Sequence, residues 1–217
     1  MSHDDERVTE ARPRRTQAER RASTRAKLLE AAVECLIERG YAGTTLAEVA
    51  QRAGLTNGAL WRHFRSKAAL MSDAALFCEA RLAFRPERLP ASLTTEQRLA
   101  QTIKHLWSRA NEPDFQALIE LVRAGRTDPE LRAGLQSTDE RAANLFYDSL
   151  AAGLGPEIAD QPGFRRNAKV LGLALYGTAL TGQLRSPMGQ RRLLEDIQGL
   201  AAELFLPAAS SGRRAQA

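Results

Sequence analysis

The residues with the clearest chemical purpose lie between positions 45 and 64. Thr45 and Thr56 each stand where a short helix is expected to begin, and Thr45-Leu46-Ala47-Glu48 forms a capping box. Gly54-Leu55 separates the two helices, and the second reaches about Phe64. This spacing predicts a helix-turn-helix, the unit that places its second helix in the major groove of duplex DNA.

The apolar residues of this unit predict which side packs inward. Leu60 and Phe64, four residues apart, line one side of the second helix, while Gly58, Arg62 and Arg65 face the opposite way. The first helix has its own apolar side, formed by Leu46, Val49, Ala50 and Ala53. The face around Gly58 and Arg62 is therefore the one predicted to read DNA.

Gly58 lies inside the second helix, where glycine costs about 1 kcal/mol relative to alanine. A short helix that keeps such a residue gains something in return, and the usual gain is close approach of its backbone to a partner. That partner is either DNA or another helix of the same chain, and the sequence leaves both open.

No arrangement of residues predicts catalysis or a metal site. The cysteines, Cys35 and Cys78, and the histidines, His3, His63 and His105, do not stand at metal-ligand spacing. Both cysteines fall on apolar helix faces and are expected to be buried thiols rather than redox sensors. A nucleophile motif, a glycine-rich phosphate loop and paired carboxylates with a histidine base are missing. We therefore expect no catalytic residues and no cofactor, and a regulator rather than an enzyme with an accessory DNA-binding domain.

The net charge of +5 is unevenly distributed. Residues 1–70 carry 13 Lys/Arg against 9 Asp/Glu, and residues 71–217 carry 18 against 17. Such asymmetry suggests contact with a polyanion, although a solvated basic tail would give the same count. No apolar run is long enough to span a bilayer, and the acidic start at Asp4, Asp5 and Glu6 is unlike a secretory signal. We expect a cytoplasmic protein without a membrane partner.

Helical periodicity with capping residues extends through almost the whole chain, and strand-like alternation never lasts. The predicted fold is all-α with about nine helices, four before a proline-containing linker at 85–90 and five after it. The first helix should stop at Gly40, which suits a left-handed C-terminal cap. The fourth is expected from Ser66 to about Phe84. The last two are expected over about 164–185 and 190–205, after a loop at 153–163.

Residues 25–70 resemble the DNA-binding domain of the TetR family of transcriptional regulators. The matching residues are Ala31-Ala32, Glu38-Arg39-Gly40-Tyr41, Thr44-Thr45, Val49-Ala50, Ala53-Gly54-Leu55-Thr56, Gly58, Leu60, His63-Phe64 and Ser66-Lys67. The match is dense and covers about a fifth of the chain, and the remainder has the helical layout that the family implies.

The resemblance implies a residue-by-residue assignment of DNA contacts. Thr45, His63, Lys67 and Ser66 are expected at phosphates, and the segment nearest the base edges is Thr56, Asn57, Gly58 and Ala59. Arg52 and Arg62 are additional candidates. Trp61 stands where the family usually has a phosphate-binding tyrosine, so the sequence leaves open whether it contacts phosphate or packs inward.

The resemblance also implies the domain organisation. Residues 22–82 are expected to form the helix-turn-helix domain, and residues 83–207 a helical ligand-binding and dimerisation domain. Residues 1–21 are expected to be a basic arm, disordered when free, and residues 208–217 a disordered tail. The arm holds Arg12, Arg14, Arg15, Arg20 and Arg21, which either enter a minor groove or act loosely through charge.

The same resemblance implies a homodimer formed by the last two helices, which would present two recognition helices to a palindromic operator. The expected interface residues are Gly172, Leu173, Tyr176, Gly177, Leu180, Leu193, Leu194, Ile197, Leu200 and Leu204. A purely intramolecular core is the alternative.

Finally, the family implies a small-molecule effector that binds in the second domain and releases the protein, a repressor, from double-stranded DNA. Each candidate pocket residue could equally belong to the core or the surface: Phe77, His105, Trp107, Phe115, Leu118, Glu120, Leu121, Arg123, Phe146 and Tyr147. A ligand-independent architectural DNA-binding protein remains an alternative function.

Overall fold

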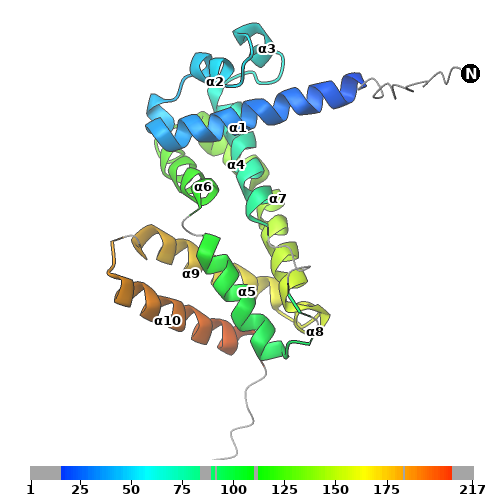
Figure 1. Ribbon diagram of the computed structural model, residues 1–217, viewed down its shortest axis with the longest axis vertical. Helices are drawn as coiled ribbons and strands as arrows, with labels where there is room; N and C mark the ends of the chain where they lie inside the picture. Colours follow the sequence, from blue (N-terminus) through cyan, green and yellow to red (C-terminus); the bar gives the residue numbers. More distant parts are fainter. Residues whose placement is uncertain (1–15, 84–88, 91, 110–111, 183, 207–217) are drawn as a thin grey trace, which may run out of the picture.

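The computed structural model describes residues 16–83, 89–90, 92–109, 112–182 and 184–206. Within these ranges the chain forms ten α-helices and no strand, so the all-α prediction is confirmed (Figure 1). The helix beyond the expected nine is α8 (Pro156–Ala159), a single turn inside the segment expected to be a loop. Pro156 begins it because a proline at the first helical position sacrifices no hydrogen bond. No helix in these ranges is long and apolar enough to cross a membrane.

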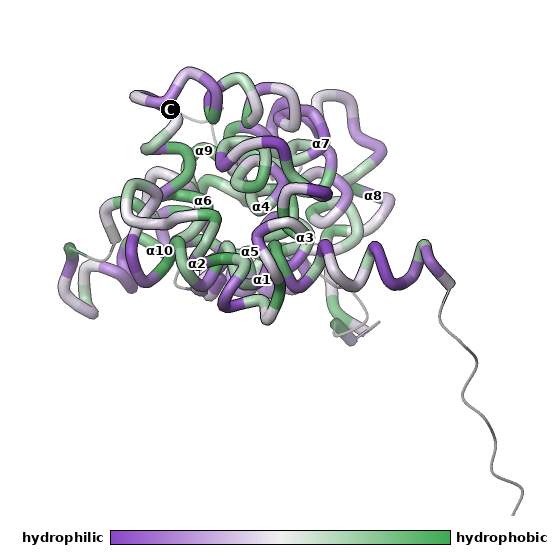
Figure 2. The backbone as a smooth tube through the Cα atoms, turned by 90° about the horizontal axis from the view of Figure 1, so that it is seen from above, coloured by the Kyte–Doolittle hydropathy of each residue, from purple (hydrophilic) through white to green (hydrophobic). Residues whose placement is uncertain are grey.

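The first helix, α1 (Gln17–Gly43), begins earlier than expected. Thr16 and Glu19 form a capping box, so residues 17–21 are helical rather than part of a disordered arm. The helical geometry breaks at Gly40, with φ 67° and ψ 175°, where the sequence predicts the end of the helix. Arg12, Arg14 and Arg15 lie outside the described residues. The N-terminal turns of α1 project from the body and are largely hydrophilic (Figure 2).

Three short connections place the next helices, and each begins at its predicted cap. The hydroxyls of Thr45, Thr56 and Ser66 accept the backbone N–H groups three residues further on. They start α2 (Leu46–Arg52), α3 (Asn57–Trp61) and α4 (Lys67–Leu82). Helix α3 is shorter than expected, and the linker expected at 85–90 falls mostly outside the described residues.

The remaining helices are α5 (Thr95–Arg109), α6 (Pro113–Ala124), α7 (Pro129–Leu154), α9 (Phe164–Gly182) and α10 (Pro187–Phe205). Of these, α6 and the start of α7 lie against α1 and α4, and the others build the lower part of the molecule in Figure 1. Pro113 and Pro129 stand at the starts of α6 and α7, as the sequence predicts. The expected tail at 208–217 lies outside the described ranges.

Two apolar cores hold the helices together, and they do not divide at residue 82. One core joins α1–α4 to α6 and to Leu131 at the start of α7. The other joins α5, α8, α9 and α10 to the end of α7. Helix α6 therefore packs against α1 and α4, the helices that hold the helix-turn-helix, and this packing connects the second part of the chain mechanically to it.

A polar junction centred on Tyr41 reinforces this connection. The backbone N–H of Tyr41 donates to Oε1 of Glu120 on α6 at 3.0 Å, and its hydroxyl donates to Oδ2 of Asp128 at 2.5 Å. The Nζ of Lys67 donates to the Tyr41 carbonyl and lies 4.2 Å from the ring centroid. Burial, together with the bond to Asp128, raises the pKa of Tyr41 above its ordinary value, so the phenol stays a donor.

Gly40 makes the junction possible, and replacing it should weaken the fold. The φ and ψ angles of Gly40 fall in a region that is essentially restricted to glycine, and an added Cβ would stand 3.0 Å from Glu120 Oε1. We expect Gly40→Ala to lower the free energy of unfolding by about 1–3 kcal/mol in urea titrations. Gly199→Ala, on α10 with open space around its Cβ, is the matched control and should be neutral or stabilising. Equal stability of the two variants would contradict the junction's importance.

Candidate nucleic-acid interface and ligand cleft

Helices α2 and α3 divide into a buried and an exposed side along the predicted lines. Val49, Ala50, Leu60 and Phe64 are buried in the first core. The segment expected nearest the bases is exposed at Thr56, Asn57 and Gly58 and half-buried at Ala59, and Arg62 and Arg65 are also exposed. The turn between the helices passes through Gly54 with φ 67°, which only glycine adopts readily. The result is an exposed polar ridge at one end of the molecule.

No helix of the described part of the chain packs against Gly58. A Cβ at this position would meet only Thr56 Oγ1, at 4.0 Å. The intramolecular alternative for this glycine is therefore removed, and its space is open to a partner outside the chain. Arg62 Nε donates to the Gly58 carbonyl at 3.2 Å, which holds the guanidinium beside the same opening.

Trp61 and His63 lie at the edges of this ridge. The Trp61 side chain is 53% exposed, so the sequence's open question of core or surface is resolved in favour of the surface. His63 is half-buried against Phe64. Burial, and then the nearby Arg21, Arg25 and Arg62, lower the pKa of His63, so the free protein carries a neutral imidazole there.

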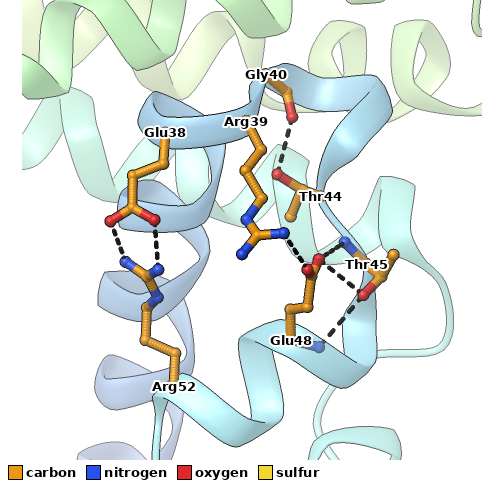
Figure 3. Close-up of polar contacts among 7 residues, drawn as sticks. All are labelled: Glu38, Arg39, Gly40, Thr44, Thr45, Glu48 and Arg52. Atoms are coloured by element: carbon orange, nitrogen blue, oxygen red, sulfur yellow. Dashed lines mark hydrogen bonds and ion pairs between the residues drawn. The ribbon is translucent and has the colours of Figure 1, made fainter.

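Two cationic candidates are engaged within the protein instead. Arg52 forms a two-pronged pair with Glu38, and Lys67 belongs to the Tyr41 junction (Figure 3 shows the Arg52 pair). Thr45 likewise exchanges hydrogen bonds with Glu48, whose other oxygen pairs with Arg39 at 2.6 Å (Figure 3). These contacts fix α2 against α1. Arg52 and Lys67 therefore have structural roles in the free chain, and these roles do not depend on what the two side chains contact in a complex with DNA.

A cleft of about 460 Å³ opens between α4, α5, α7 and α9, with α6 along one side. Three of the predicted pocket residues line it: Phe115, Phe146 and Tyr147. The sequence did not single out Glu79 or Arg109, and it placed Tyr176 in the dimer interface, yet all three line the cleft. Glu79 had a signal that could have been read: it is a lone acid within the apolar stretch Ala74–Ala80 of α4.

The other predicted pocket residues lie elsewhere. Leu118 and Leu121 are buried in the first core, and Phe77 packs against it. Trp107 packs against the second core, and His105 lies beside Arg109. Arg123 is exposed, and Glu120 serves the Tyr41 junction. Tertiary packing separates these residues because helical spacing alone cannot say which helix faces which.

The charged groups of the cleft differ in how they are satisfied. Arg109 pairs with Glu112 at 3.1 Å and also donates to the Arg81 carbonyl. Among the described residues, none donates a hydrogen bond to Glu79 or forms an ion pair with it. Burial raises the pKa of Glu79 to about 7. In the described part of the chain, no three His, Cys, Asp or Glu side chains gather as a metal site would require.

Comparisons with known proteins agree with this architecture. The model of the bacterial regulatory proteins of the tetR family matches residues 28–74, which contain the whole helix-turn-helix. The transcriptional regulator CymR of Pseudomonas putida is 36% identical over 139 residues, which cover 62% of this chain and 67% of CymR. The chain belongs to the TetR family. It is thus a DNA-binding transcriptional regulator and not an enzyme.

Solved TetR-family structures share the fold over most of the chain. A Rhodococcus regulator assigned to the family superposes with a TM-score of 0.65 at 19% identity, covering 85% of this chain and 99% of the other. FadR of Bacillus subtilis, solved in complex with stearoyl-CoA, gives a TM-score of 0.54 at 20% identity over 83% of this chain and 97% of FadR. At these identities the likeness concerns the fold.

The expected dimer residues of this TetR-family chain fall into three groups. Gly177 and Leu180 are exposed on α9. Gly172, Leu173 and Tyr176 line the cleft, although Leu173 is also 64% exposed. On α10, Ile197 is buried in the second core, and the four leucines are half-buried: Leu193, Leu194, Leu200 and Leu204.

Replacing Gly58 should separate stability from DNA binding in this regulator. We expect Gly58→Ala to raise the free energy of unfolding by about 1 kcal/mol, because its Cβ enters open space within a helix. We expect the same methyl group to weaken binding to the operator by about tenfold or more, measured by fluorescence anisotropy. Gly199→Ala is the control that should keep full DNA affinity. Unchanged affinity in Gly58→Ala would remove this face from the interface.

Proposed function

We propose that this protein is a repressor that binds a palindromic operator as a homodimer and dissociates when a small molecule occupies the cleft. The observation that carries the DNA part is the exposed ridge of α3, where Gly58 leaves space for close approach and Arg62 is held beside it. Trp61, Thr45, His63 and Ser66 surround this ridge and can meet phosphates. Such backbone contacts position a protein, and the residues nearest the bases then specify the sequence.

A seam on α9 supports the homodimer. Val170, Leu173, Gly177 and Leu180 on α9, and Leu184 just beyond its end, are all exposed and recur at spacings of three and four residues. This is the repeat of a helix that packs along another helix, and Leu184 is 88% exposed in the single chain. A second copy would cover the seam and present a second α3 to the DNA.

Helix α6 supports a route from the cleft to the DNA-binding face. Phe115 and Val122 on α6 line the cleft, while Glu120 on the same helix holds the Tyr41 N–H. Tyr41 lies just before the cap of α2. A ligand that displaces α6 would therefore move the start of the helix-turn-helix, and coupling of about 1–3 kcal/mol is typical of linked sites.

The DNA-binding proposal is tested with the full-length protein and duplex fragments from the neighbourhood of its own gene. Footprinting at physiological salt should protect one short, two-fold symmetric site. Arg62→Ala should weaken binding to that site by about tenfold, since loss of an arginine contact to a base costs about 1–3 kcal/mol. Arg191→Ala, an exposed arginine on α10, is the matched control. Continuous coating of long DNA would instead support an architectural protein, and absence of any specific site would refute the proposal.

The dimer is tested by sedimentation of charged variants of equally exposed apolar residues. Leu180→Glu should convert the dimer to a monomer at micromolar concentration, because it buries an unpaired charge in the seam. Ile37→Glu, on α1, is the control, since Ile37 is 45% exposed and Leu180 is 42% exposed. A dimer that survives Leu180→Glu would exclude the α9 seam as its interface.

A further inference from the structure

We propose that the cleft takes an apolar molecule carrying one ammonium group, with that group against the carboxylate of Glu79. This inference deepens the proposed effector site and rests on it. It names the chemical class of the ligand from the way the cleft's own charges are satisfied.

The walls of the cleft are mainly apolar and aromatic. Phe115 on α6 and Tyr176 on α9 lie with ring centroids 6.1 Å apart, and Phe146 and Tyr147 lie 6.2 Å apart. The remaining wall is largely aliphatic, with Leu82, Leu106 and Leu175 among its residues. The volume of about 460 Å³ falls in the range of small-molecule sites. The body of the ligand is therefore apolar.

Glu79 is the exception in this wall. It comes from the last turn of α4, is half-buried in largely apolar surroundings and has no ion-pair or hydrogen-bond partner among the described residues. Burying a carboxylate without a partner is costly, and pairing it with a cation removes that cost. One positive charge next to Glu79 on α4 would therefore complement the cleft.

The cationic side chains of the cleft are less available to a ligand anion. Arg109 already has Glu112, the Arg81 carbonyl and His105 Nε2 as partners. Its Nε has no partner but is fully buried, so it does not face the open space. Lys169 is exposed at the rim on α9, and exposed Asp139 lies at the rim on α7. Inside the cleft a ligand carboxylate would have to displace an existing bond of Arg109, and only at the rim could it meet Lys169, where water screens the pair, whereas an ammonium inside the cleft meets Glu79 directly.

The aromatic residues add a second, independent preference for a cation. An ammonium near the face of an aromatic ring is attracted by the ring quadrupole. The chain uses this contact at the cleft already, because the Arg165 guanidinium lies 5.3 Å from the Tyr147 ring centroid. The rings of Phe115, Phe146 and Tyr176 provide further such faces.

Protonation of Glu79 supports this assignment and gives a measurable signature. Because burial raises its pKa to about 7, roughly half of the free protein carries an uncharged Glu79 at neutral pH. An ammonium ligand would favour the carboxylate and release a proton. Its affinity should therefore rise by about tenfold between pH 6 and pH 8. The other charged or titratable groups around the cleft are Arg109 and its partners His105 and Glu112, together with Asp139, Lys169, Tyr147 with Arg165 over its ring, and Tyr176 with Arg123 near it, and Glu79→Gln leaves all of them in place.

The test uses three probes that differ only in their head group: 4-butylbenzylamine, 4-butylbenzyl alcohol and 4-butylbenzoate. Calorimetry on the full-length protein at pH 8, without DNA, should show the amine binding about tenfold or more tighter than the alcohol, with the benzoate weakest. Glu79→Gln should reduce the amine to the affinity of the alcohol and abolish the pH dependence. Asp139→Asn removes an exposed carboxylate from the same cleft and should keep the preference.

Three outcomes would overturn the proposal: equal or tighter binding of the benzoate, an amine preference that survives Glu79→Gln, or no binding of any probe at millimolar concentration. Folding of Glu79→Gln is checked by thermal unfolding. Because the pKa of Glu79 is higher in the folded than in the unfolded protein, the native wild type loses stability as the pH rises from the unfolded to the folded pKa. The melting temperature of the glutamine variant should therefore be higher than that of the wild type at pH 8 and equal to it at pH 4. Loss of the amine preference while operator binding persists would refute the ligand class alone. Loss of operator binding would refute the proposed function, and the calorimetric test of the ligand class would remain valid because it is performed without DNA.

Discussion

The hydrogen bond from the Tyr41 N–H to Glu120 joins the two parts of the molecule at the point where the chain reverses. The reversal requires the positive φ of Gly40, and it leaves an unpaired N–H that the carboxylate on α6 satisfies. Asp128 and Lys67 hold the Tyr41 hydroxyl and carbonyl from two other directions. Three polar groups of one residue are thus satisfied from α4, α6 and the start of α7, and α2 begins only a few residues later. The orientation of the helix-turn-helix depends on this one residue remaining in place.

Contacts within the protein also determine which residues remain available to contact DNA. Arg39 pairs with half-buried Glu48 and Arg52 with exposed Glu38, and these two ion pairs fix α2 on α1 (Figure 3). Bonds from Thr45 lower the pKa of Glu48, and the Arg52 bond lowers that of Glu38, so both pairs persist over a wide pH range. Arg39 and Arg52 thus serve to hold α2 rigidly on α1. The proposed recognition face around α3 consists instead mainly of small and neutral residues, with Arg62 and Arg65 as its charged members.

Two features of the isolated chain, the α9 seam and the acid in the cleft, are expected to be stabilised by a partner. The α9 seam exposes a row of apolar side chains, and the cleft holds a half-buried acid that has no counter-ion among the described residues. Both are unfavourable in a lone molecule and favourable once occupied, the first by another apolar helix and the second by a cation. They lie close together, because Leu173 belongs to both. Occupancy of the cleft and packing of α9 are therefore expected to influence one another.

The sequence by itself determined the elements whose causes are local. Capping hydroxyls at Thr45, Thr56 and Ser66, the glycines at 40 and 54 and the apolar spacing of α2 and α3 act within a few residues, so the helix-turn-helix and its outward face were predictable. The sequence prediction placed the start of α1 too late, because the arginines around Thr16 and Glu19 suggested an arm although these two residues form a capping box. Only the tertiary structure decided that Lys67 turns to Tyr41, that Leu118 and Leu121 join the first core, and that Glu79, Arg109 and Tyr176 share a cleft. Those outcomes depend on which faces of distant helices meet, and helical periodicity specifies that a face is apolar without specifying what covers it.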